Sequence, residues 1–163
     1  MYAPRERAKG TLMFDVIVVG TDGSETAAVA VERAFEIAAI AGGTVHVVHA
    51  HHLVSVAQLA SSATYGAPNF DIDNVNKGIE AQSRSVVEHV AQRAERQGVK
   101  CETHLRDDDA AHALISVAEQ VGADLLVVGN RGMSGVRRML GSVPNKVSHH
   151  CPCDLLIVDT TAP

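Results

Sequence analysis

Short runs of aliphatic residues, separated by segments with helical periodicity, are the feature that most restricts how this chain can fold. Runs of four such residues, bounded by turn residues, are typical of strands that are buried on both faces of a parallel sheet. Between Lys100 and Leu105, polar and apolar residues alternate instead, which predicts a half-exposed strand at a sheet edge. The uninterrupted runs are Val16–Val19, Leu125–Val128 and Leu155–Val158. A fourth run, Val45–Val48, is interrupted by His46.

The segments between these strands carry apolar residues at helical spacing and end at glycines. The spacing predicts helices over 27–41, about 75–94, and 110–121 with Asp109 as the N-cap, and a short helix over about 143–148. Either Asp22 or Ser24 can cap the first helix. Residues 55–76 are rich in Ser, Ala, Gly and Asn and have no period, so they predict a loop.

Five strands that alternate with helices predict an α/β fold, a doubly wound five-stranded parallel sheet with helices on both faces. If the first three strands extend the sheet in one direction and the last two in the other, the strand order is 3-2-1-4-5. The first and fourth strands then become neighbours at a topological switch point. Ligands of such sheets bind in the crevice beyond the carboxyl ends of these strands.

Composition excludes several classes of function. The formal net charge is -5 and there is no long run of Lys or Arg, so a nucleic-acid partner is not expected. The apolar runs are too short to span a bilayer, and residues 1–13 are charged and resemble a flexible leader rather than a secretion signal. We therefore expect a cytoplasmic protein with no membrane partner. Three cysteines in such a chain predict reduced thiols.

The segment from Gly129 to Ser142 follows a buried strand and precedes a helix. Glycines allow positive φ and the close approach of a ligand to the main chain, so that successive N–H groups can point at one anion. Ser142 is a natural N-cap for the next helix, with Val143 and Pro144 in the first turn. The free N–H groups and the dipole of that helix would attract phosphate.

The segment has two other interpretations, turn-forming glycines and a known nucleotide fingerprint. The glycines can simply form tight turns, which is the ordinary role of isolated glycines. The known nucleotide fingerprints fit poorly, because the first strand is followed by Gly20-Thr-Asp-Gly23 rather than G-x-G-x-x-G, and no G-K-[ST] is present. Dehydrogenase and kinase functions therefore lose support.

The segment resembles the motif G-x2-G-x9-G-[ST] of the ATP-binding universal stress proteins, through Gly129, Gly132, Gly141 and Ser142. Here eight residues separate Gly132 from Gly141, where the motif has nine. The resemblance extends from about Phe14 to Asp159 and includes Asp22 after the first strand. It implies a universal stress protein domain over 14–159, an adenine nucleotide α-hydrolase-like fold and a tail at 160–163. It also implies a homodimer that forms through the last strand, Leu155–Val158.

The resemblance further implies a bound adenine nucleotide, either ATP with Mg²⁺ or Mn²⁺ on its phosphates or, as an alternative, cyclic AMP. We expect binding rather than fast catalysis, with at most slow ATP hydrolysis. A ligand-free dimeric interaction module is the remaining alternative. The implied cofactor-binding residues are Gly20, Thr21 and Asp22 at the adenine and ribose, Ala50 at the base, and Val128, Gly129, Arg131, Gly132, Gly141, Ser142 and Val143 along the phosphates.

Other clusters of reactive side chains are interpreted structurally. His149, His150, Cys151 and Cys153 lack the spacing of zinc ligands, so no metal site is expected there. His46 and His49 lie on a predicted central strand and are expected to be buried, hydrogen-bonded imidazoles. Arg137 and Arg138 are expected to be solvated. No set of nucleophile, base and orienting acid can be assembled, so no catalytic residue is predicted.

Overall fold

The computed structural model describes residues 14–55, 57, 71–130 and 142–160. Three expectations therefore fall outside the described residues. These are the leader at 1–13, most of the predicted loop at 55–76, and the part of the glycine-rich segment from Arg131 to Gly141.

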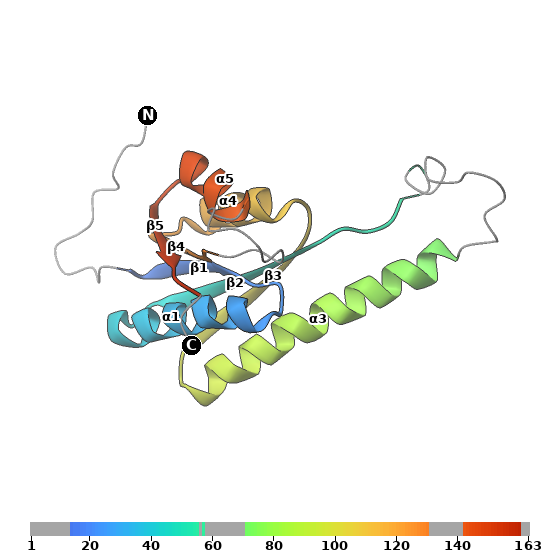
Figure 1. The fold of residues 1–163 in the computed structure, drawn as a ribbon. Helices are drawn as coiled ribbons and strands as arrows, with labels where there is room; N and C mark the ends of the chain where they lie inside the picture. The colour runs from blue at the N-terminus through green and yellow to red at the C-terminus, as the bar shows by residue number, and fades with distance from the viewer. Residues whose placement is uncertain (1–13, 56, 58–70, 131–141, 161–163) are drawn as a thin grey trace.

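One five-stranded parallel sheet forms the centre of the fold (Figure 1). Its strand order is β3-β2-β1-β4-β5, which confirms the predicted order and places β1 beside β4. The edge position of β3 is confirmed as well. The strands are β1 (Val16–Gly20), β2 (Thr44–His51), β3 (Lys100–Asp107), β4 (Leu125–Gly129) and β5 (Asp154–Val158).

Helices cover both faces of the sheet, as predicted for a doubly wound fold. On one face α1 and α3 bury one set of strand residues, among them Ile17, Val45 and Val127. On the other face α4 and α5 bury the alternate set, including Val18 and Leu126. This period-two division explains the unbroken aliphatic runs of β1, β4 and β5. The helices are α1 (Glu25–Ala41), α3 (Ile72–Arg96), α4 (Ala110–Val121) and α5 (Ser142–His150).

The predicted helix ends have clear local causes. The hydroxyl of Ser24 accepts a hydrogen bond from the N–H of Ala27 at 3.1 Å, so Ser24, rather than Asp22, is the N-cap of α1. Asp109 caps α4 in the same way. Gly42 and Gly122 follow α1 and α4 in the left-handed conformation, which glycine adopts without steric cost.

The boundaries of two helices and the burial pattern of one strand differ from the prediction. The helix α3 begins at Ile72, so residues 72–76 are helical although they were predicted to be loop. Asp71 caps this helix by accepting a hydrogen bond from the N–H of Asn74 at 3.1 Å. The short helix α5 runs from Ser142 to His150, so Ser142 is its first residue and not a preceding cap. On β3 the expected alternation is incomplete, because Thr103 is exposed while His104 is half-buried.

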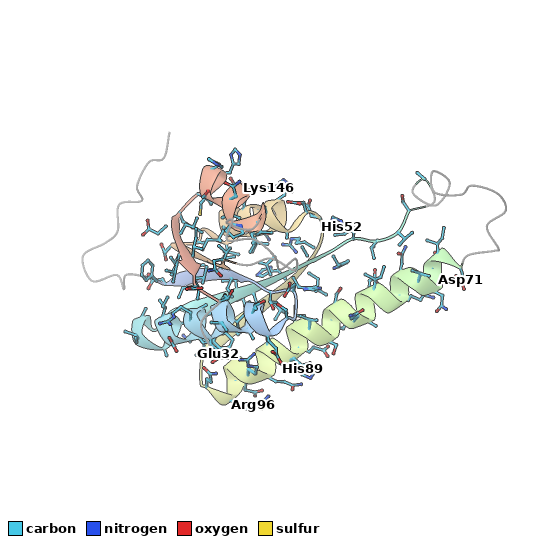
Figure 2. The ribbon with its side chains drawn as sticks, in the orientation of Figure 1. Glu32, His52, Asp71, His89, Arg96 and Lys146 are labelled. Atoms are coloured by element: carbon cyan, nitrogen blue, oxygen red, sulfur yellow. The ribbon has the colours of Figure 1, made fainter. Side chains whose placement is uncertain are left out.

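The helix α3 extends beyond the end of the sheet (Figure 1). Its buried residues, Ser83, Val87, Val90 and Ala94, lie between its middle and its C-terminal end. There Glu32 of α1 accepts hydrogen bonds from Arg93 and from Gln97, and Figure 2 shows Glu32 on the side of α1 that faces α3. Near its beginning, the Asn76 amide exchanges two hydrogen bonds with the backbone of Val54, at 2.8 and 3.0 Å.

The start of β1 is held by close backbone contacts. One carboxylate oxygen of Asp124 accepts hydrogen bonds from the N–H groups of Asp15 and Val16, both at 3.0 Å. The N–H of Thr44 bonds to the carbonyl of Asp15 at 2.9 Å. Gly43 is buried between these segments, and a Cβ atom there would overlap the carbonyl oxygen of Phe14 and lie 3.0 Å from that of Asp15. A glycine at this position is therefore a packing requirement.

Among the helices that the structure describes, none is long and apolar enough to cross a membrane. The cysteines are free thiols, as expected, and all three are half-buried.

Cys151 and Cys153 lie between α5 and β5 with their sulfur atoms 3.9 Å apart. The hydrogen bond between them lowers the pKa of Cys151 to about 7 and raises the pKa of Cys153. Burial raises the pKa of Cys101 to about 11. Because the thiolate is the nucleophile, we expect iodoacetamide near neutral pH to alkylate Cys151 at least about tenfold faster than Cys101. Peptide mass spectrometry against time measures both rates; faster labelling of Cys101 would contradict the assignment.

Candidate functional site

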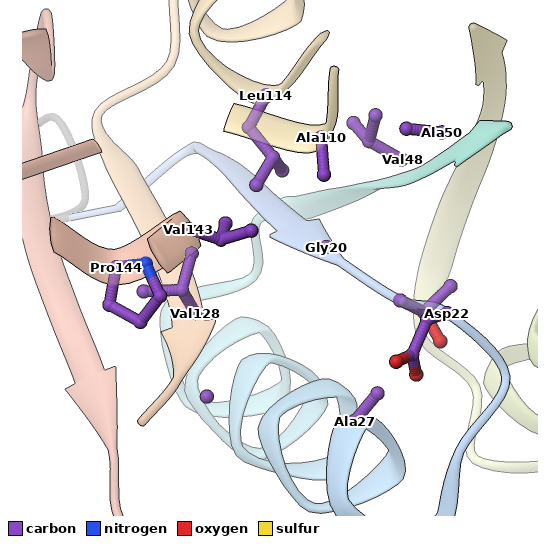
Figure 3. A pocket seen from close by; sticks show the side chains of 12 residues that line it. Gly20, Asp22, Ala27, Val48, Ala50, Ala110, Leu114, Val128, Val143 and Pro144 are labelled. Carbon is purple, nitrogen blue, oxygen red and sulfur yellow. The ribbon is translucent and has the colours of Figure 1, made fainter. Parts of the chain in front are cut away.

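A cavity of about 110 Å³ opens at the carboxyl ends of β1 and β4, at the switch point of the sheet (Figure 3). The first turns of three helices, α1, α4 and α5, complete its wall. Its lining residues are Gly20, Thr21, Asp22, Ala27, Val48, Ala50, Ala110, Leu114, Val128, Gly129, Val143 and Pro144.

The cavity brings together residues that the sequence analysis predicted from separate segments. The predicted residues that line it are Gly20, Thr21, Asp22, Ala50, Val128, Gly129 and Val143. Ser142 is the first residue of α5, beside Val143. Arg131, Gly132 and Gly141 lie outside the described residues.

Five lining residues were not predicted, and most of them are small or aliphatic. Ala27, Ala110 and Pro144 belong to the first turns of helices that follow the crevice. Their position one to three residues after a predicted N-cap (Ser24, Asp109 or Ser142) was a usable signal, since helix N-termini face the carboxyl edge in this fold. Val48 and Leu114 come from β2 and α4 and require the packing itself to be known.

The turn after β1 is fixed by its own hydrogen bonds. The N–H of Thr21 donates to the carbonyl of Val48 at 2.9 Å, and the hydroxyl of Thr21 accepts from the N–H of Gly23 at 3.2 Å. His49 donates from Nδ1 to the carbonyl of Thr21 at 2.9 Å. The contact confirms that His49 is a hydrogen-bonded imidazole, but its side chain is half-buried rather than buried. The turn is thus held in place before any ligand arrives.

Asp22 is exposed at the rim of the cavity, where one carboxylate oxygen accepts the N–H of Ser24 at 2.9 Å. This bond orients the side chain, as Figure 3 shows. Among the described lining residues, Asp22 carries the only ionisable side chain. Its carboxylate can accept hydrogen bonds from hydroxyl or amino groups of a ligand.

The beginning of the glycine-rich segment is anchored by Asn130, a residue that the sequence analysis did not single out. Its backbone N–H donates to the carbonyl of Val158 at 2.8 Å, and its side-chain amide donates to Asp159 at 2.8 Å. Its side-chain oxygen accepts from both the N–H and the hydroxyl of Thr160, at 3.0 and 2.8 Å. Thr160, which was assigned to the tail, is buried by this arrangement.

The N-termini of α4 and α5 meet at one side of the cavity, where Lys146 bonds to the Asp109 carboxylate at 3.2 Å. Burial raises the pKa of Asp109, but the bonds from Lys146 and from backbone N–H groups outweigh it and lower the pKa overall. Lys146 projects from α5 in Figure 2. The pair links α5 to the N-cap of α4.

Most of the cavity wall is aliphatic, while its rim offers a carboxylate at Asp22 and the N-terminus of α5 at Val143. Aliphatic walls accommodate a flat apolar ring system, and a helix N-terminus attracts an anion. In the view of Figure 3, Asp22 lies on the opposite side of the cavity from Val143 and Pro144. The described lining contains no His, Cys or Lys.

Comparisons with known proteins agree on one family. The sequence model of the universal stress protein family matches residues 13–159. The universal stress protein YxiE of Bacillus subtilis is 31% identical over 147 residues, which cover 90% of this chain and 99% of that protein. A crystal structure of a universal stress protein in complex with cAMP is 31% identical, with a TM-score of 0.66 and coverage of 91% of this chain and 98% of that one.

A family protein of Arabidopsis thaliana, solved with AMP bound, has a TM-score of 0.64 at 18% identity and covers 90% of this chain and 92% of that one. This second structural match supports the Rossmann-like α/β fold.

Proposed function

The chain belongs to the universal stress protein family, and from this premise we propose that it binds an adenine nucleotide in the cavity between β1 and β4. The observation that carries the proposal is the meeting of Asp22, the aliphatic wall and the N-terminus of α5 around one cavity at the switch point. The relative that is 31% identical and was solved with cAMP supports it.

The base and ribose would occupy the part of the cavity between Ala50 and Asp22. Val48 and Leu114 would contact the adenine ring, and the Asp22 carboxylate would accept hydrogen bonds from ribose hydroxyls. The negative charge of Asp22 keeps phosphates away from this side, so the phosphates would point toward Gly129 and Val143. There the free N–H groups at the start of α5 provide partners for phosphate oxygens.

Within this proposal the ligand is ATP, with Mg²⁺ or Mn²⁺ on its phosphates, and cyclic AMP is the alternative. Gly132, Gly141 and Ser142, which match the family motif, would contribute the remaining phosphate contacts together with Arg131. The cation would be held by phosphate oxygens and water rather than by a protein cage, as Mg²⁺ usually is at nucleotides. We propose binding with at most slow hydrolysis.

Calorimetric titration of the purified protein tests the proposal with ATP, ATP plus MgCl₂, AMP and cyclic AMP. We expect saturable binding with one site per chain. In competition, displacement of cyclic AMP by ATP identifies ATP as the ligand, and the reverse identifies cyclic AMP. Small molecules released by heat denaturation are identified by mass spectrometry in parallel. If no nucleotide is released and none binds at millimolar concentration, the proposal is wrong.

We also propose that the chain forms a homodimer through β5. This strand is at the edge of the sheet, and Leu155, Leu156 and Ile157 on it are only half-buried within one chain. An unpaired apolar edge of this kind favours pairing with a second copy across a two-fold axis. Light scattering after size exclusion measures the mass, and a monomer at micromolar concentration would contradict the proposal.

A further inference from the structure

Three potential metal ligands lie together on β2 and β3, near the edge of the sheet opposite β5. His46 of β2 is paired in register with Glu102 of β3, and Val48 is paired with His104. Because alternate residues of a strand share a face, all three side chains lie on the face of the sheet that α4 covers, together with Val18 and Val48. This cluster is separate from the lining of the switch-point cavity.

The donor atoms of the three side chains are already close to one another. The Nδ1 atom of His46 is 3.0 Å from Nε2 of His104 and 3.6 Å from a carboxylate oxygen of Glu102. All three donor atoms lie within 4.8 Å of one another. Ligands held about 2.0–2.1 Å from a tetrahedral zinc ion are separated by roughly 3.3 Å, so small side-chain movements bring these atoms to a coordinating distance.

We propose that His46, Glu102 and His104 form a binding site for a divalent transition-metal ion, with Zn²⁺ as the expected occupant. Two imidazole nitrogens and one carboxylate are a donor set that zinc favours, whereas Mg²⁺ and Ca²⁺ require oxygen ligands. Three protein ligands leave a fourth position for water. Nothing in the proposed nucleotide function requires this site.

The scaffold supports the site in two ways. The ligands are carried by paired strands, which hold side chains more rigidly than loops do. The side chain of His46 is only 9% exposed, whereas that of Glu102 is 65% exposed. The site is therefore anchored by a buried imidazole and remains accessible from solvent through Glu102.

The competing interaction is a hydrogen bond between the two imidazoles without any metal. A bound metal ion would have to displace the N–H that these two rings share. Arg106 opposes a cation at this place, but its guanidinium donates to Gln120 of α4 at 2.9 Å. The Glu102 carboxylate offsets that positive charge.

Zinc titration of the full-length, chelator-treated protein tests the site in the absence of nucleotide. We expect one Zn²⁺ per chain at this site, and we expect Co²⁺ to give the visible absorption of tetrahedral coordination. His104→Gln should weaken binding at least about thirtyfold and Glu102→Gln about tenfold. His112→Gln is the matched control, because His112 is an exposed histidine that also contacts a carboxylate, that of Asp108; it should stay within twofold of wild type.

Thermal unfolding provides a second readout. Zinc at about 100 times Kd should raise the wild-type Tm by roughly 5–10 °C, and the His104→Gln protein should lose this rise while its circular dichroism spectrum stays native. Absence of saturable binding below about 100 µM overturns the proposal. So does an affinity that His104→Gln leaves unchanged, because the ion would then be bound elsewhere. The two proposals can fail independently. If the protein binds nucleotide but not zinc, only the zinc site is wrong; if it binds zinc but not nucleotide, only the proposed function is wrong.

Discussion

Replacing Ala50 with leucine is expected to weaken nucleotide binding at least about thirtyfold, or about 2 kcal/mol of binding free energy. Ala50 lies at the end of β2, is half-buried and lines the cavity of about 110 Å³. A leucine there adds three carbon atoms to a space that the adenine base would need. The loss is measured by calorimetry with whichever adenine nucleotide the wild-type protein binds most tightly.

Ala39→Leu is the matched control, because Ala39 is exposed on α1 and does not line the cavity. It should leave the affinity within about twofold of wild type, as surface substitutions usually do. If Ala50→Leu binds nucleotide as tightly as Ala39→Leu does, the base does not occupy the cavity. The nucleotide site would then have to be sought elsewhere on the chain.

Gly43→Ala is expected to cost about 2–3 kcal/mol of the free energy of unfolding, which lowers Tm by roughly 4–12 °C. The added Cβ would overlap the Phe14 carbonyl oxygen. The obstacle is backbone at the start of β1, where Asp124 and Thr44 fix the neighbouring residues, so it cannot move aside as a side-chain end would. Chemical denaturation and calorimetry measure the change.

Gly78→Ala provides the opposite control within the same protein. Gly78 is exposed in α3, and a Cβ there would meet nothing within 4 Å. Alanine is the better helix former and meets no obstacle here, so this variant should be at least as stable as wild type. A Gly43→Ala protein that is as stable as wild type would show that the backbone at Phe14 yields easily.

Much of the fold could be predicted because its main elements are encoded locally. The aliphatic runs specify strands buried on both faces, and Ser24, Asp109, Gly42 and Gly122 mark helix ends with groups that act on their immediate neighbours. The strand order followed from handedness and the switch-point rule. The start of α3 was missed although Ile72, Val75 and Ile79 have helical spacing and Asp71 is a natural N-cap, because these residues follow directly on a long segment without a period.

The site could be predicted only to the level of segments. The loops after β1 and β4 were identified from glycines and position, whereas the anchoring role of Asn130 depends on Asp159 and Thr160, which lie about thirty residues away along the chain. The cluster of His46, Glu102 and His104 depends on the pairing register of β2 and β3. A shift of one residue between the two strands would put His46 on the opposite face from Glu102 and His104.

The projecting part of α3 places a thermodynamic boundary inside a continuous helix. A helix of 25 residues is about 37 Å long, whereas the eight-residue strand β3 beside it spans roughly 26 Å. Residues before Ser83 therefore lie beyond the cooperative core, held by local hydrogen bonds and by the Asn76 amide. Changes in the length of this overhang alter its reach without removing a single core contact, so evolution can vary it independently of the sheet and the cavity.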